Sequence, residues 1–319
     1  MADLEQQEPE ANWERRTLEK VALAAITEQR RARYWGIFFK ALGFVYLFAL
    51  LIIGMGWLGK KDSRPDKHTA MVELNGVIAS DSQASAENIM SGLQEAFKDK
   101  RTQGVILRIN SPGGSPVQAG HINDEIRRLR EKYPNIPLYA VIEDICASGG
   151  YYVAVAADRI YVDKASIVGS IGVLMDSFGF TGTMEKLGVE RRLLTAGDNK
   201  GFLDPFSPVV ESQQAHAKQM LEEIHQQFVT VVKTGRGDRL KDSPDLFSGL
   251  VWVGAKSIEL GLADEFGGVE YVAREVVKAE EIVDFTPREN LAERLAKRFG
   301  AGVGEAIGRF GETSNVKLR

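Results

Sequence analysis

Residues 104–115 read GVILRINSPGGS and residues 137–152 read PLYAVIEDICASGGYY. Each stretch opens with a short, nearly continuous apolar run, which is typical of a strand buried on both faces of a parallel sheet. A helical pattern over 117–132 lies between them, and the second stretch passes into an apolar helix after its glycines. A strand, a helix and a second strand in this order predict a parallel βαβ unit. The loops that follow such strands meet at one edge of the sheet, where functional groups gather.

The flanking sequence extends this alternation and predicts an α/β domain over residues 70–285. Further strands are expected at 71–78 (with a turn inside), 159–162 and 189–195. Helices are expected at 84–99 and 208–233, and residues 251–268 should form a strand, a helix and a closing turn.

The composition excludes several classes of protein. The 319 residues are 44% hydrophobic and 26% charged, which is ordinary for a chain with a packed core and excludes a wholly disordered one. The 40 basic residues are balanced by 44 acidic ones, so no basic field points to nucleic acid. Cys146 is the single cysteine and there are four histidines, so we expect no internal disulfide, no metal site and no cofactor.

One local anomaly stands out against these averages. Residues 41–58 carry no charge, and adding 34–39 lengthens the apolar stretch with only Lys40 inside it. About 20 apolar residues are enough to cross a bilayer, and aromatic residues (Tyr34, Trp35 and Trp57) lie near both ends. A cleavable signal peptide fits poorly, because a long polar segment precedes the run and no A-x-A site follows it. We expect a polar tail at 1–33, a transmembrane anchor at 34–59 and a linker at 60–69.

The basic residues around this anchor favour one orientation. Residues 20–40 hold five Lys and Arg and residues 59–79 hold four, so the positive-inside rule places the N-terminus in the cytoplasm and the main domain outside it. At the other end of the chain, residues 286–319 form an amphipathic tail with apolar residues every four positions from Leu291 to Ile307. Docking of this tail on protein is the default expectation, with a membrane surface as the alternative.

Ser148 lies where a strand passes into a helix, which is the position of a candidate nucleophile. The N–H of Gly149 could receive an oxyanion there, and the Gly113-Gly114 pair brings bare N–H groups close to a ligand. The arrangement is similar to a nucleophile elbow, although Cys146 replaces the first glycine of G-x-S-x-G. A helix cap with close packing is the alternative interpretation of this serine.

A nucleophilic serine needs a base, and the histidines are poor candidates. His121 alone follows a glycine loop, whereas the others lie in the linker or on a polar helix. Lys200 lies in the loop TAGDNKGFLDPFSP (195–208), and desolvation can lower a lysine pKa from about 10.4 by roughly 3–5 units, into the range of a base. From context alone, a surface lysine is the better interpretation of Lys200.

Taken together, NSPGG, ASGGYY, VGSIGV (168–173) and AGDNKGFLDPFSP resemble the motifs of the SppA-type signal peptide peptidases, peptidase family S49. The resemblance covers about residues 70–275. It implies a ClpP/crotonase-like α/β fold, one N-terminal transmembrane helix and a homo-oligomeric ring. It also implies a serine protease with Ser148 as nucleophile and Lys200 as general base.

The resemblance assigns further roles as well. The oxyanion hole would come from Gly113, Gly114 and Gly149, and Ser170 would hydrogen-bond the lysine. The substrates would be cleaved signal peptides and other apolar peptides, at the bacterial inner membrane, with the catalytic domain in the periplasm and without a cofactor. Cys146 stands where many relatives have alanine, and we expect it to pack as a small apolar group.

Two other functions stay open at this point. A crotonase-like acyl-CoA enzyme would also use glycine-rich backbone donors, and a catalytically silent membrane scaffold would need no nucleophile. The anchor and Lys200 argue against the first, and labelling of Ser148 by a fluorophosphonate would exclude the second.

Overall fold

The structure is a computed structural model that describes residues 8–54 and 65–288, and it divides into two units, 1–63 and 64–319. The first unit contains one continuous helix, α1 (Glu8–Gly54). Within it, Arg15–Ile52 is long and apolar enough to cross a membrane, by length and composition. The predicted anchor at 34–59 falls on α1 as far as Gly54, and its last residues lie outside the described ranges. Most of the predicted C-terminal tail, from residue 289 onward, also lies outside them.

The second unit is built on one mixed sheet of eight strands. Its main path runs β6-β5-β3-β2-β1-β8, and the short strands β4 and β7 continue from one side of β3. All of the pairings are parallel except that of β5 with β6. The strands are β1 (His68–Asn75), β2 (Thr102–Ser111), β3 (Leu138–Ala147), β4 (Arg159–Val162), β5 (Ile167–Gly169), β6 (Val251–Val253), β7 (Glu265–Phe266) and β8 (Ile282–Asp284).

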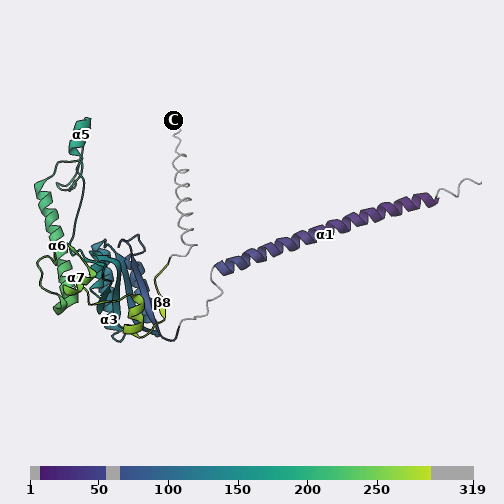
Figure 1. The fold of residues 1–319 in the computed structure, drawn as a ribbon. Coiled ribbons are helices and arrows are strands. Elements are labelled where there is room, and N and C mark those ends of the chain that lie inside the picture. The colour runs from purple at the N-terminus through teal and green to yellow at the C-terminus, as the bar shows by residue number, and fades with distance from the viewer. Residues whose placement is uncertain (1–7, 55–64, 289–319) are drawn as a thin grey trace, which may run out of the picture. The chain divides into compact units, whose positions relative to one another are not determined.

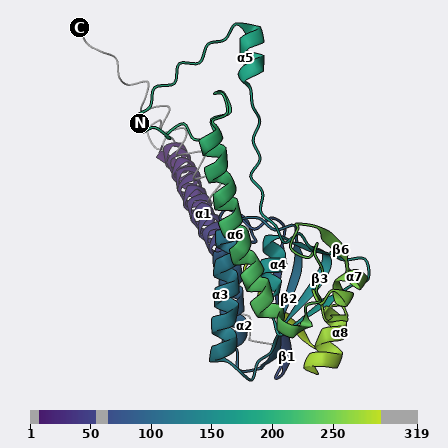
Figure 2. The same cartoon turned by 90° about the vertical axis from the view of Figure 1, so that its left-hand side faces the viewer.

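Helices cover both faces of this sheet, which explains the apolar runs in its strands. On β2, Val105 and Leu107 belong to the large core beneath the helices that include α2 and α3. The intervening Ile106 faces a second, smaller core with Val272. The helices are α2 (Ala86–Lys98), α3 (Pro116–Lys132), α4 (Gly149–Ala154), α5 (Thr181–Leu187), α6 (Glu211–Arg236), α7 (Gly254–Glu259), α8 (Val269–Tyr271), a 3-10 turn η1 (Gly237–Arg239) and the π-helical segment η2 (Val272–Val277). Figure 2 shows α3 and α6 as long helices of this unit.

The predicted α/β architecture is confirmed, and the helix expected at 208–233 is α6. Three local predictions are wrong. The strand expected at 189–195 is an irregular exposed segment, because no strand lies beside it to pair with. The second half of the strand expected at 71–78 is reduced to a single bridge between Ile78 and Gly114. His68, assigned to the linker, is buried at the start of β1.

Residues 172–210, between β5 and α6, form a projecting segment that we call the arm. Figures 1 and 2 show it extending from the sheet, with α5 near its far end. Its parts contact one another: Phe180 stacks on Phe206 with ring centroids 5.3 Å apart, and Arg191 Nε lies 3.1 Å from a carboxylate oxygen of Asp204. The arm therefore has a local structure of its own, although most of its residues are exposed.

Candidate active site

The glycine loop after β2 is fixed to the chain that follows β1. The N–H of Ile78 donates to the Gly113 carbonyl at 2.8 Å, and the N–H of Ser115 donates to the Ile78 carbonyl at 2.8 Å. A Cβ on Gly114 would lie 2.2 Å from the Ile78 carbonyl oxygen, which no side chain allows. A Cβ on Gly113 would lie 2.7 Å from the Gly149 nitrogen. Glycine is therefore required at both positions, because backbone passes on each side of the loop.

Ser148 occupies the junction of β3 and α4 in a strained conformation. Its φ is 52° and its ψ is −123°, a region that residues with a side chain rarely adopt and that is found at functional sites. Its N–H donates to Gly169 at 2.9 Å and its carbonyl accepts from Tyr152 at 3.0 Å, so hydrogen bonds hold the strained turn on both sides. The hydroxyl makes no capping hydrogen bond to α4. A merely structural helix cap would use it, so the geometry favours a nucleophile.

The three glycines expected to form an oxyanion hole differ in how their N–H groups are engaged. The N–H of Gly113 is buried and donates to the Ser111 hydroxyl at 3.1 Å, so it is not available to a substrate. Gly114 and Gly149 line the cavity beside Ser148, and within the described residues their N–H groups have no hydrogen-bond acceptor. A Cβ on Gly149 would lie 3.3 Å from the Gly114 nitrogen, which places the two donors close together. Gly114 and Gly149 are thus the glycines of this site whose N–H groups could receive an oxyanion, and Gly113 forms the turn before Gly114.

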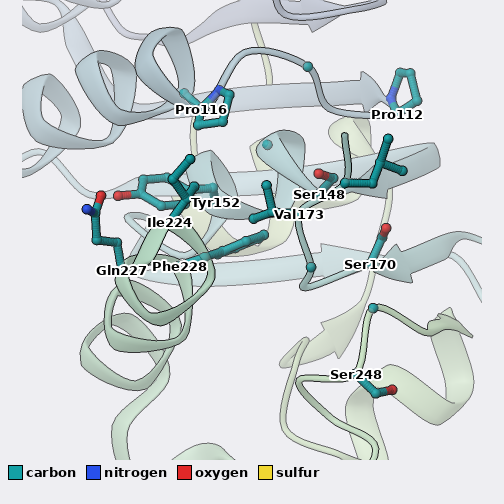
Figure 3. A pocket seen from close by; sticks show the side chains of 16 residues that line it. Pro112, Pro116, Ser148, Tyr152, Ser170, Val173, Ile224, Gln227, Phe228 and Ser248 are labelled. Carbon is teal, nitrogen blue, oxygen red and sulfur yellow. The ribbon is translucent and has the colours of Figure 1, made fainter. Parts of the chain in front are cut away.

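Ser170 lies at the same cavity, as expected from VGSIGV. Its φ is 51°, and its N–H donates to the Leu250 carbonyl at 2.8 Å. Figure 3 shows the side chains of Ser148 and Ser170 in the same part of the cavity. Two serines held in strained turns on neighbouring segments therefore face one space.

This cavity has a volume of about 530 Å³, and its wall combines apolar side chains with serines and Gln227. Figure 3 shows Tyr152, Ile224 and Phe228 grouped on the side away from Ser170, with Gln227 beyond them. The rings of Tyr152 and Phe228 lie 5.2 Å apart. Sequence reasoning missed the contribution of α6, although the i, i+4 spacing of Ile224 and Phe228 marks a helix face that packs on the body.

The histidines on α6 also differ from one another. His216 is exposed, as expected of a polar helix. His225 is half-buried and lies 3.2 Å, through Nε2, from the Ile171 carbonyl oxygen, so it links α6 to the segment that follows Ser170. His225 is therefore not simply a solvated side chain.

The structure does not bring Lys200 or His121 to Ser148. Lys200 is exposed on the arm, and His121 is exposed on α3; neither lines the cavity of its own subunit. Among the described residues that line the cavity, Tyr152 alone has a titratable side chain, and burial raises the pKa of its phenol. The described lining of the cavity therefore contains neither a lysine nor a histidine.

Cys146 lies below the nucleophile and behaves as a packing residue. It is fully buried in the large core, and burial raises the pKa of its thiol. In residues 8–54 and 65–288, no three His, Cys, Asp or Glu side chains gather to hold a metal ion.

A serine in a strained turn with an uncapped hydroxyl, two free backbone donors beside it and a cavity at the carboxyl edge of a parallel sheet define the class of the protein as a serine hydrolase. The comparisons with known proteins narrow this class. The model of "Peptidase family S49" matches residues 130–283. A putative protease of Methanocaldococcus jannaschii is 32% identical over 225 residues, which are 67% of this chain and 71% of that protein. A putative signal peptide peptidase SppA of Enterococcus faecium is 28% identical over 234 residues, 71% of this chain and 67% of that protein.

A higher identity, 46% over 182 residues, links the chain to a Na(+)/H(+) antiporter NhaA of Brucella abortus. The match covers 57% of this chain but only 25% of that protein, so the chain spans about a quarter of the length of this relative. The family is nevertheless shown by the relatives that are matched over most of their length: the chain belongs to peptidase family S49. The expected ClpP/crotonase-like α/β fold class is confirmed with it.

Proposed function

We propose that this protein is a membrane-anchored serine endopeptidase with Ser148 as nucleophile and Lys200 as general base. The observation that carries the proposal is the geometry of Ser148, a strained residue with an uncapped hydroxyl beside the N–H groups of Gly114 and Gly149. Relatives named as proteases support the peptide as substrate.

The reaction proceeds through an acyl-enzyme. Ser148 Oγ forms a bond to the carbonyl carbon of the scissile peptide while its proton passes to the neutral lysine amine. The Gly114 and Gly149 N–H groups stabilise the oxyanion, each by about 2.7–4 kcal/mol. The C–N bond then breaks as the lysine returns the proton to the leaving amine. Water, deprotonated by the same lysine, hydrolyses the ester and restores Ser148.

Lys200 reaches this site from a neighbouring copy of the chain. It is exposed on the arm, which projects from its own sheet, and many large apolar side chains of the arm are exposed within the described residues. Leu194, for example, is 96% exposed. A large exposed apolar surface marks an interface, and a head-to-tail contact of identical copies that closes on itself forms a ring. Burial of the arm in this ring supplies the desolvation that a lysine base needs.

The cavity indicates the kind of peptide that is cleaved. Its wall of Tyr152, Ile224 and Phe228 suits an apolar side chain, whose burial contributes roughly 1.5–3 kcal/mol. Residual signal peptides consist largely of such side chains and are left in the membrane, where α1 would hold the enzyme. We place the protein in the bacterial inner membrane with the catalytic unit in the periplasm, from the excess of basic residues before the apolar stretch.

Labelling of the full-length protein with a fluorophosphonate tests the nucleophile. We expect covalent modification of Ser148, absent in Ser148→Ala. Peptide hydrolysis by a protein that does not take up the label would refute the assignment of Ser148. A protein that neither takes up the label nor hydrolyses peptides would indicate the catalytically silent membrane scaffold. Binding of acyl-CoA would indicate the crotonase-like enzyme.

Mixing two inactive variants tests the base and its origin. Ser148→Ala and Lys200→Ala should each be inactive alone. Co-expressed, they should recover about a quarter of the wild-type activity, because random assembly pairs an intact serine with a neighbour's intact lysine at about that fraction of interfaces. Full activity of Lys200→Ala alone would refute the dyad, and no recovery on mixing would refute the shared site.

A further inference from the structure

Ser111 is the last residue of β2, and its side chain is fully buried beside the active site. It has no part in the dyad. Its hydroxyl accepts a hydrogen bond from the N–H of Gly113 at 3.1 Å. A serine hydroxyl that bonds the backbone two residues further on fixes a local turn.

The turn sets two consecutive peptide planes. Ser111 fixes the direction of the Gly113 N–H, and the N–H of Ile78 fixes the Gly113 carbonyl at 2.8 Å. In a trans peptide the carbonyl and the following N–H point in opposite directions. Because the Gly113 carbonyl points toward Ile78, the N–H of Gly114 points away from Ile78, on the side where Gly114 lines the cavity.

Ser111 also touches the other half of the oxyanion hole. A Cβ on Gly150 would lie 3.0 Å from the Ser111 carbonyl oxygen and 3.3 Å from the Ser111 Cβ. Gly150 directly follows Gly149, the second donor, so Ser111 packs beneath that turn while it bonds the loop that carries Gly114. One small polar side chain thus contacts both segments that supply an oxyanion donor.

We infer that Ser111 is a positioning residue: it fixes the peptide plane before Gly113, so that the next plane, which Ile78 fixes, keeps the Gly114 N–H directed toward the oxyanion and at a set spacing from the Gly149 N–H. Without the hydroxyl, the buried Gly113 N–H loses its acceptor, and a buried donor without a partner is costly enough to reorient the loop. The inference rests on the proposed function of Ser148, and its test includes a readout that does not depend on activity.

The experiment uses two test variants in the full-length protein: Ser111→Ala and the size-matched Ser111→Cys, whose sulfur is only a weak hydrogen-bond acceptor. Ser115→Ala in the same full-length protein is the control. Ser115 lies in the same loop, but its hydroxyl accepts only from Gln118 at 3.4 Å, at the start of α3. Hydrogen exchange of the loop amides and the rate of Ser148 modification by a fluorophosphonate are measured in parallel, together with kcat and KM for an apolar peptide.

Both Ser111 variants should exchange the Gly113 amide faster than the wild type. Both should slow the modification of Ser148 and kcat by roughly 10- to 100-fold, with KM changed less than about twofold, because the lost interaction is made in the transition state. Ser115→Ala should match the wild type in all of these rates. Wild-type rates in either folded Ser111 variant would overturn the inference. A rise in KM by the same factor as the fall in kcat would also overturn it.

The failure of the proposed function would look different. If the wild type itself does not react with the fluorophosphonate, the assignment of Ser148 as nucleophile fails. The exchange of the Gly113 amide still decides the role of Ser111: unchanged exchange in both variants refutes the turn, whatever the activity.

Discussion

The substitution Gly114→Ala tests the oxyanion hole most directly. The new Cβ would lie 2.2 Å from the Ile78 carbonyl oxygen and 2.8 Å from the Ile78 nitrogen, on a residue whose φ is +147°. An alanine also avoids this φ, so the backbone has two reasons to move. The loop must shift by about 1 Å to restore an ordinary contact distance, and the bridge between Gly114 and Ile78 is then broken.

The size of the effect follows from the geometry of the donor. An oxyanion donor works at about 2.7–3.1 Å, so a 1 Å displacement removes the Gly114 N–H from the transition state. The loss of one donor costs about 2.7–4 kcal/mol, which corresponds to a 10²- to 10³-fold fall in kcat. KM should change little, since the apolar wall of the cavity is untouched.

The assay is the hydrolysis of an apolar peptide by the full-length protein, with the unfolding temperature measured on the same samples. Gly120→Ala is the matched control: Gly120 lies within α3, a Cβ added there would meet no described atom within 4 Å, and alanine stabilises a helix interior by roughly 0.5–1 kcal/mol. A folded Gly114→Ala protein with kcat within about threefold of the wild type would refute the assignment of this donor.

Three further predictions concern stability, reactivity and selectivity. Arg236 is buried and donates to the Gly261 carbonyl at 2.8 Å and twice to Asp264 at 2.9 Å. Arg236→Met should cost about 3–5 kcal/mol, because the Asp264 carboxylate loses its main charged partner and keeps only Arg239 at 3.5 Å. The melting temperature should fall by roughly 10 °C, with partial recovery in the double variant with Asp264→Leu. Burial alone would raise the pKa of Asp264, but the hydrogen bonds and charge of Arg236 outweigh burial and hold that pKa below its ordinary value of 3.8. The stability that this carboxylate contributes is therefore present above about pH 4 and is lost as the pH falls through the lower pKa of the folded state. Acid unfolding that begins at the same pH in Arg236→Met as in the wild type would contradict this. Burial raises the pKa of the Cys146 thiol, so a maleimide should modify it only on unfolding, and rapid labelling of the native protein would be inconsistent with the structure. Phe228→Ala should enlarge the cavity and move the preference toward bulkier apolar side chains in a competition between peptides, and an unchanged preference would remove Phe228 from the cavity wall.

The strands that could be predicted are those that are buried on both faces along their length. β2 and β3 are covered on both faces, so their apolar runs identify them without knowledge of their neighbours. The segment 189–195 has a similar local composition, but a strand also needs a partner, and the arm provides none. Apolar residues such as Leu194 mark an exposed surface there, which a local pattern cannot distinguish from a core.

The same division applies to the site. Ser148 and its glycine loops are recognisable because the strand, the serine and the helix are adjacent in sequence. Which loop N–H is free depends on the Ser111 hydroxyl, a three-dimensional detail that the motif does not contain. The wall that α6 supplies comes from a distant part of the chain, and the position of Lys200 depends on how the arm leaves the sheet.

The exposed arm has a consequence for the life of the molecule in the cell. Lys200 is held away from the cavity of its own subunit. Under the proposed function, a newly made copy would therefore have a nucleophile but no base, and it would be latent. Activity would then begin only when copies meet in the plane of the membrane, and it would rise more steeply than in proportion to their surface density. Dilution of the membrane by lipid would switch such an enzyme off.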